Sequence, residues 1–272
     1  MAAGEVSEGT PLERAASRVR ELARDYEAPD FAHVPGADAA IFLCAVDHKT
    51  GYVEAHEVDG LGPFSGSELM WTLGLRAAKG RPGLLTARRL RYAAAGEVAE
   101  WFRIDAETVA DPERRAALWR DLAAGLERDH GSSAESLLAK AGGRLAGDSG
   151  LIALLRRYRA YGDPLAKKAF LFAKIAERCG WFQVADPESW EVSADNVLMR
   201  LALRSGLVPP GSLDEVRAQT REALKQLANE AELSPPVLDD LLWELGRDDP
   251  DLLGRAAGDV REPARDPAST WY

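Results

Sequence analysis

The chain has 272 residues, of which 46% are hydrophobic and 29% are charged, a composition typical of a folded globular protein. It has no apolar run of about 18 residues and no apolar stretch of signal-peptide type near its start, so we expect a soluble cytoplasmic protein without a membrane partner. Its two cysteines exclude a disulfide framework, and its formal net charge of −10 disfavours duplex DNA as the main partner.

The N-terminal part predicts one helix and one β-hairpin. Thr10, Pro11 and Glu13 match a capping box with proline at the first helical position, and they predict a helix that runs to about Tyr26. The proline- and glycine-containing segment 27–39 is expected to be a loop. Residues 40–46 and 52–58 are rich in apolar and β-branched side chains, and they predict two strands around a turn.

Helical patterns dominate the rest of the chain. Helices are predicted over residues 65–79, from Asp111 onward, over 134–139, around 151–158, over 163–179, from Asp195 to Gly206, from Ser212 onward and over 234–246. No repeat or linker is visible, so we expect one domain over residues 1–272. It comprises an N-terminal helix and hairpin (1–62), a helical body (63–246) and an irregular tail (247–272).

The segment around Asp195 carries the strongest functional signal. Asp195 precedes a helix with an apolar face, and Gly206 follows that helix. Aspartate is among the favoured N-cap residues, so a purely structural role is one interpretation. The other is catalytic, because Asp195, Asn196 and Arg200 resemble the catalytic segment of base-excision glycosylases of the helix-hairpin-helix superfamily. The glycine hairpin with which those enzymes grip DNA phosphates is replaced here by residues 162–169.

A longer resemblance runs from about residue 40 to the end of the chain. Short motifs in the same order resemble the queuosine salvage proteins, which release queuine from queuosine 5′-phosphate. These motifs are Phe64-Ser65-Gly66, Lys167-Lys168-Ala169, Ser193-Ala194-Asp195, Glu215-Val216-Arg217, Leu238 to Trp243 and Trp271-Tyr272. The chain departs from the family where Cys44 to His48 replace an aromatic stretch, and where Asn196-Val197 follow Asp195 in place of Tyr-Arg. A divergent relative that acts on another modified nucleotide would also fit.

The resemblance implies a mainly α, helix-hairpin-helix DNA glycosylase-like fold with a small N-terminal β-hairpin, and an N-glycosidase activity. Asp195 would be the catalytic carboxylate, because a fixed negative charge stabilises the oxocarbenium-like sugar of the transition state. Lys167 and Lys168 would contact a phosphate or another part of the substrate, unless they are solvated surface lysines.

The base of the substrate needs its own contacts. Asp239 or Asp240 could bind the leaving base, and Phe64 or Trp243 could stack on it. Trp71 and Phe170 are further aromatic candidates, and we expect most of these four rings to lie in the core.

No metal and no organic cofactor are expected. The acidic, histidine-containing segment 47–59 could hold a metal only if its ligands converged, but strand residues of opposite parity point to opposite faces. The expected partner is a small nucleoside or nucleotide, and the oligomeric state is left open. Two alternatives remain: a DNA glycosylase acting on a damaged base such as 8-oxoguanine, for which DNA would be the partner, and a non-catalytic nucleotide-binding protein on the same scaffold.

Overall fold

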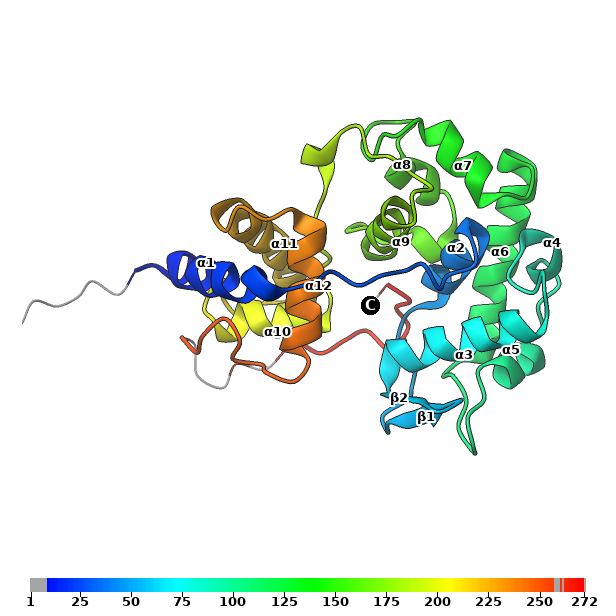
Figure 1. Ribbon diagram of the computed structural model, residues 1–272, viewed down its shortest axis with the longest axis horizontal. Coiled ribbons are helices and arrows are strands. Elements are labelled where there is room, and N and C mark those ends of the chain that lie inside the picture. Colours follow the sequence, from blue (N-terminus) through cyan, green and yellow to red (C-terminus); the bar gives the residue numbers. More distant parts are fainter. Residues whose placement is uncertain (1–8, 257–259, 261, 272) are drawn as a thin grey trace, which may run out of the picture. The chain divides into compact units, whose positions relative to one another are not determined.

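The computed structural model describes residues 9–256, 260 and 262–271. Within them the protein is mainly helical, with twelve α-helices and one two-stranded antiparallel sheet (Figure 1). The expectation of a mainly α protein with a small hairpin is therefore confirmed. Among the described helices, none combines the length and the apolar character that crossing a membrane requires.

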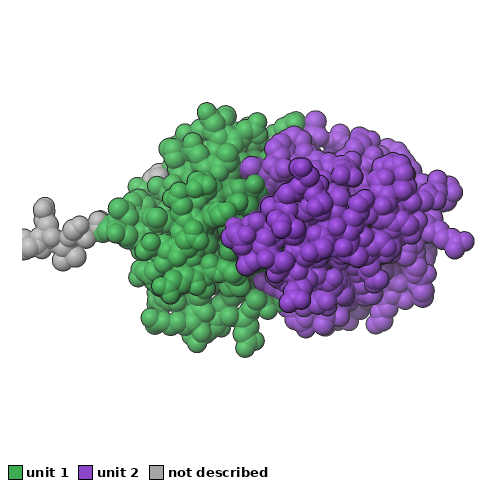
Figure 2. Space-filling model, turned by 90° about the horizontal axis from the view of Figure 1, so that it is seen from above, with its two compact units in different colours: residues 1–29, 190–267 green, residues 30–189, 268–272 purple. Residues whose placement is uncertain are grey.

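The chain divides into two compact units, and each is built from two separate stretches (Figure 2). Unit 1 contains residues 1–29 and 190–267, and unit 2 contains residues 30–189 and 268–272. The expectation of a single domain over residues 1–272 stays a prediction.

Unit 1 is a small helical bundle. Its elements are α1 (Pro11–Leu22), η1 (Ala23–Asp25), α10 (Asn196–Arg204), α11 (Leu213–Glu230) and α12 (Pro235–Gly246). Helix α10 packs against both α11 and α12, and α1 packs against α11. The shared core includes Val19, Leu198, Leu224 and Leu241, all with no exposed surface. The predicted capping boxes at Thr10 and Ser212 both form, which confirms the two helix starts.

Unit 2 holds the hairpin and the remaining helices. Its elements are α2 (Ala37–Val46), β1 (His56–Val58), β2 (Leu61–Phe64), α3 (Gly66–Gly80), α4 (Ala87–Leu90), α5 (Ala95–Trp101), α6 (Pro112–His130), α7 (Ala134–Ala141), α8 (Leu151–Leu155), η2 (Arg159–Tyr161), α9 (Lys167–Arg178) and η3 (Pro187–Ser189). Helix α2 lies at its centre and packs against α6, α7 and α9. The C-terminal end of α2 lies at the first turns of α6 and α9, because Arg115 of α6 contacts His48 and Lys168 of α9 donates to the carbonyl of Ala45.

The predicted strand over residues 40–46 is wrong, because these residues form most of helix α2. Every residue from Ala39 to Val46 is buried, so the helix has no polar face and no helical period in its sequence. A short, uniformly apolar run cannot be distinguished from a buried strand by periodicity. The hairpin lies further along the chain, where His56 pairs with Phe64 and Val58 with Leu61.

The other predicted helices form close to their expected positions, but α9 starts later than expected. Asp163 does not begin the helix. Its carboxylate accepts hydrogen bonds from the amides of Leu165 (3.0 Å) and Lys167 (3.1 Å), and Ala166 adopts a left-handed conformation with φ of 52°. This turn delays the start of α9 to Lys167. Helices α4 and α5 were not predicted.

The tail after Arg247 was expected to be irregular, and its described residues contain no helix or strand. Residues 257–259, 261 and 272 of that tail lie outside the described residues, and so does the Tyr272 half of the Trp271-Tyr272 resemblance. Residues 1–8 of the predicted N-terminal segment are also outside them.

Candidate functional site

In unit 1, Asp195 is the N-cap of helix α10. Its side-chain Oδ1 accepts a hydrogen bond from the amide of Leu198 at 3.0 Å, and the residue is 8% exposed. The capping role is therefore confirmed. A buried carboxylate at a helix N-terminus is stabilised by the amides and the helix dipole, so the same geometry also suits a catalytic charge.

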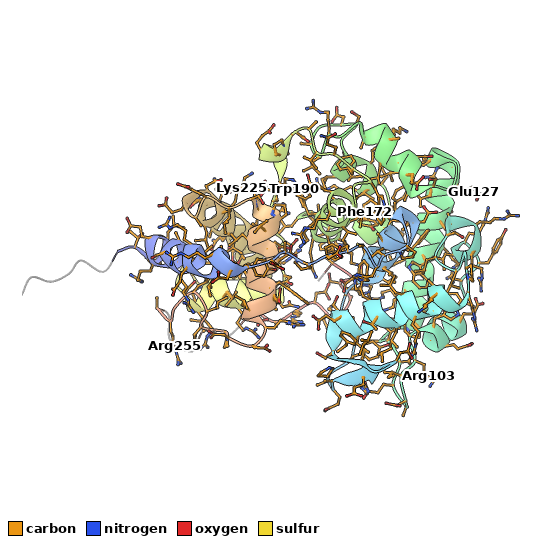
Figure 3. The ribbon with its side chains drawn as sticks, viewed as in Figure 1. Arg103, Glu127, Phe172, Trp190, Lys225 and Arg255 are labelled. Carbon is orange, nitrogen blue, oxygen red and sulfur yellow. The ribbon has the colours of Figure 1, made fainter. Side chains whose placement is uncertain are left out.

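The loop that leads to Asp195 is fixed by a second carboxylate. It starts at Trp190, which is buried (Figure 3). Oδ1 of Asp239 on helix α12 accepts a hydrogen bond from the amide of Ser193 at 2.9 Å, and the amide of Asp195 donates to the carbonyl of Ser193 at 3.0 Å. The structure thus joins two predicted site residues, Asp195 and Asp239, through one short loop. Asp240 follows on α12 and is 7% exposed.

Two further residues of unit 1 belong to the predicted motifs. Arg200 on α10 donates to the carbonyls of Gly246 (2.6 Å) and Arg247 (3.2 Å), so it ties α10 to the end of α12. Trp243 is half-buried and packs against the core of unit 1, and the guanidinium of Arg247 lies 4.6 Å from its ring centre. Stacking of Trp243 on a base stays a prediction.

In unit 2, Lys168 is buried, with 1% of its surface exposed. Its Nζ donates to the carbonyl of Ala45 at 2.7 Å and lies 3.0 Å from Nδ1 of His48. The solvated-surface interpretation is therefore wrong for Lys168. Lys167 is half-buried, and its role toward a phosphate stays a prediction.

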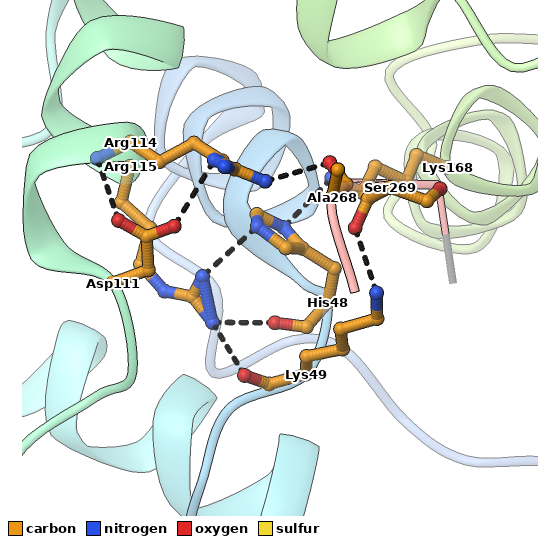
Figure 4. A network of polar contacts seen from close by, with 8 residues as sticks. All are labelled: His48, Lys49, Asp111, Arg114, Arg115, Lys168, Ala268 and Ser269. Atoms are coloured by element: carbon orange, nitrogen blue, oxygen red, sulfur yellow. Dashed lines mark hydrogen bonds and ion pairs between the residues drawn. The ribbon is translucent and has the colours of Figure 1, made fainter. Parts of the chain in front are cut away.

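His48 is held between two basic side chains, Lys168 and Arg115 (Figure 4). On the opposite side of its ring from Lys168, Nε2 lies 3.0 Å from NH1 of Arg115. NH2 of Arg115 also donates to the carbonyls of His48 and Lys49. Burial is the main cause that lowers the pKa of His48 far below its usual range. Burial also lowers the pKa of Arg115 to about 10 and that of Lys168 well below 10.5.

Asp47 is the negative charge nearest to this group in sequence. Its carboxylate accepts hydrogen bonds from the hydroxyl of Ser67 (2.7 and 2.8 Å) and from the indole NH of Trp71 (3.2 Å), both on α3. Trp71 therefore positions Asp47, while Phe170 is a core residue and Phe64 is half-buried in β2.

Arg115 was missed by the sequence analysis, although the sequence contains a signal for it. It precedes Leu118, Trp119 and Leu122 by three, four and seven residues, so it lies on the buried face of helix α6. A charged residue on an apolar face needs a buried partner. His48 was weighed only as a metal ligand.

The predicted site residues belong to both units. Asp195, Asp239, Asp240 and Trp243 lie in unit 1, whereas Phe64, Lys167 and Lys168 lie in unit 2. Across the described part of the chain, no group of three or more His, Cys, Asp or Glu side chains is arranged to hold a metal ion. Comparison of the sequence with protein-family models and with curated proteins finds no match. The likeness to queuosine salvage proteins therefore rests on the motifs in the sequence.

Proposed function

We propose that the chain is an N-glycosidase that hydrolyses the base–ribose bond of a modified nucleotide, with queuosine 5′-phosphate as substrate and queuine as product. The observation that carries this proposal is the fixed position of Asp195 at the start of α10, with Asp239 bonded to the same loop. The order of the family-like motifs supports the same substrate class and a glycosylase-like fold.

The proposed reaction needs a fixed negative charge beside the anomeric carbon. As the bond to the base breaks, positive charge develops on the sugar, and the carboxylate of Asp195 stabilises it. The carboxylate can then attack that carbon or activate a water molecule, and water supplies the new hydroxyl in both cases. Asp239 is bonded to Ser193, and Asp240 is buried next to it on α12, so either carboxylate is proposed for the contact with the departing base.

Lys167 and Lys168 differ in what surrounds their side chains. Nζ of Lys168 is engaged inside unit 2, whereas Lys167 is only half-buried. Lys167 is therefore the lysine of unit 2 that we propose for contact with an anionic group. Its amide is already bonded to Asp163, so the contact would come from its side chain.

The test is release of free base, measured by chromatography with mass detection. Queuosine 5′-phosphate and duplexes containing 8-oxoguanine or uracil are incubated with the wild type and with Asp195→Asn. Asparagine caps helices as well as aspartate does, so the variant should fold. Asp214→Asn is the matched control, because Asp214 is an exposed carboxylate in the first turn of α11 in the same unit.

We expect queuine release by the wild type and by Asp214→Asn, and a loss of roughly 10²–10³-fold or more in Asp195→Asn. Release from the DNA substrates alone would identify a repair glycosylase. Binding of queuosine 5′-phosphate without turnover would identify a non-catalytic binding protein. Equal release by the wild type and Asp195→Asn would contradict the assignment of Asp195.

A further inference from the structure

The hydrogen bonds around His48 in unit 2 determine the charge of Lys168. A guanidinium has only N–H donors, so NH1 of Arg115 must donate to Nε2 of His48, 3.0 Å away. A neutral imidazole with an accepting Nε2 carries its proton on Nδ1. That Nδ1–H points at Nζ of Lys168, also 3.0 Å away, and only an uncharged amine has the lone pair to accept it.

The surroundings of Lys168 agree with an uncharged amine. The titratable and charged groups that act on Lys168 or on its neighbours Cys44 and His48 are Asp47 and Lys49 from the turn after α2, Arg115 from α6, and Lys167 and Lys174 from α9. Burial is the largest effect that lowers the pKa of Lys168, and the charges of Lys167 and Arg115 act in the same direction. Asp47 opposes them.

The same Arg115 supports the turn that follows α2. Its NH2 donates to the carbonyls of both His48 and Lys49. Lys49 has a φ of 36°, a left-handed conformation that is unfavourable for a residue with a side chain. The two hydrogen bonds from Arg115 therefore hold Lys49 in a backbone conformation that it would not adopt by itself.

Lys49 in turn holds the end of the chain within unit 2. Its Nζ donates to the carbonyl of Ser269 at 3.0 Å, and NH1 of Arg114 donates to the carbonyl of Ala268 at 2.6 Å (Figure 4). We call residues 268–271 the C-terminal strap. Arg115 is therefore connected to the strap through Lys49, while Arg114 contacts the strap directly.

We propose that unit 2 contains a proton-operated latch, in which protonation of Lys168 releases the C-terminal strap. An ammonium at Lys168 must donate to Nδ1 of His48, and the proton on Nδ1 then has to move to Nε2. Nε2–H would face the N–H of NH1, so the guanidinium of Arg115 moves away from the ring, and its NH2 contacts with the carbonyls of His48 and Lys49 are weakened. The net change is the uptake of one proton from solvent, and the turn that presents Lys49 to Ser269 loses its support.

The first experiment measures the charge of Lys168 directly. In protein labelled with ¹⁵N-lysine, the Nζ nitrogen resonance distinguishes an amine from an ammonium, and Lys168→Met identifies which signal belongs to Lys168. We expect one uncharged lysine at pH 7, which becomes protonated as the pH is lowered. An ammonium at Lys168 at pH 7 would overturn the proposal.

The second experiment measures the strap by amide hydrogen exchange, corrected for the intrinsic effect of pH. In the wild type, the amide of Trp271 donates to Oγ of Ser269 at 3.1 Å, and we expect its protection to fall by roughly tenfold as Lys168 becomes protonated and Ser269 is released. In Lys168→Met this fall should disappear. In Lys167→Met it should move to higher pH, because a positive charge that disfavours protonation has been removed. Strap protection that is independent of pH in the wild type, or unchanged in Lys168→Met, would contradict the latch.

A second variant covers the case in which Lys168→Met does not fold. Lys49→Met removes the hydrogen bond to Ser269 and leaves the contacts of Lys168 in place. Strap protection should then be lower than in the wild type and independent of pH, because only the contact of Arg114 with Ala268 remains, while the nitrogen resonance of Lys168 titrates as in the wild type. A fully protected strap in this variant would show that Lys49 does not hold it.

Discussion

The two units bury ionisable side chains with opposite kinds of partner. In unit 1, Asp195 and Asp239 each accept a hydrogen bond from a backbone amide. In unit 2, Lys168 and Arg115 face the two nitrogens of one imidazole and donate to backbone carbonyls. Backbone amides stabilise the negative charge of a carboxylate. A neutral imidazole has only one accepting nitrogen, so it can accept a hydrogen bond from only one of two neighbouring cations.

The difference shows that burial alone does not decide what a charged residue does. A carboxylate bonded to amides remains suited to electrostatic chemistry. An amine that must accept a hydrogen bond becomes uncharged and can take up a proton. We therefore propose that catalysis belongs to unit 1 and that the response to pH belongs to unit 2.

The largest expected effect separates capping from catalysis at Asp195. Asp195→Ala removes both the cap and the charge, so we expect the free energy of unfolding to fall by about 1 kcal/mol and base release to be lost. Asp195→Asn should lose base release to the same extent and keep its stability. Chemical denaturation and chromatography measure the two effects, and an active Asp195→Ala would refute the catalytic role.

The second largest effect concerns the buried guanidinium of Arg115 in unit 2. Arg115→Met leaves Nε2 of His48 and two backbone carbonyls without their donor, so we expect a loss of about 2–4 kcal/mol in the free energy of unfolding. Arg114→Met is the control, because Arg114 is half-buried, pairs with the partly exposed Asp111, and should cost less than about 1 kcal/mol. Urea titration measures both variants, and equal losses would mean that the buried contacts of Arg115 contribute little.

The third effect is the pH dependence of stability. The folded-state pKa of Lys168 lies well below 10.5, so the unfolded chain binds one more proton than the folded chain in the interval between the folded-state pKa and 10.5. Stability must therefore rise with pH across that interval, by up to about 1.4 kcal/mol per pH unit. Urea titrations at several pH values should show this slope in the wild type and lack it in Lys168→Met, while an identical slope in both would exclude Lys168 as its source.

Local signals predicted much of the fold. The starts of α1 and α11 follow from capping boxes at Thr10 and Ser212, whose contacts span three residues and need no tertiary information. Helix α2 was missed because all its faces are buried, and its conformation depends on packing against α6 and α9. The late start of α9 was missed because proline after Asp163 is a normal helix start, and only the contacts of the Asp163 carboxylate show the turn.

The surroundings of Asp195 and of Lys168 also differ in whether their contacts are local in the sequence. The position of Asp195 could be predicted because a cap and the helix after it are adjacent in sequence. The burial of Lys168 could not, because Ala45 and His48 precede it by more than a hundred residues and no local pattern links them. The charge state of such a lysine depends on hydrogen-bond directions that appear only when the three segments are brought together.

The smallest expected effect concerns Asp239, whose carboxylate holds the loop before Asp195. Asparagine at this position keeps the oxygen that accepts from the amide of Ser193, whereas alanine removes it. If Asp239 acts by positioning, Asp239→Asn should retain most of the base release, and Asp239→Ala should lose about tenfold through kcat with KM nearly unchanged. If Asp239 instead uses its charge on the substrate, both variants should be equally impaired, and the pH–rate profile should lose the same limb in each. Faster amide exchange at Ser193 in Asp239→Ala, but not in Asp239→Asn, would tie the loss of rate to the loop. This exchange can be measured without knowing the substrate, because it depends only on the hydrogen bond from the amide of Ser193 to Asp239.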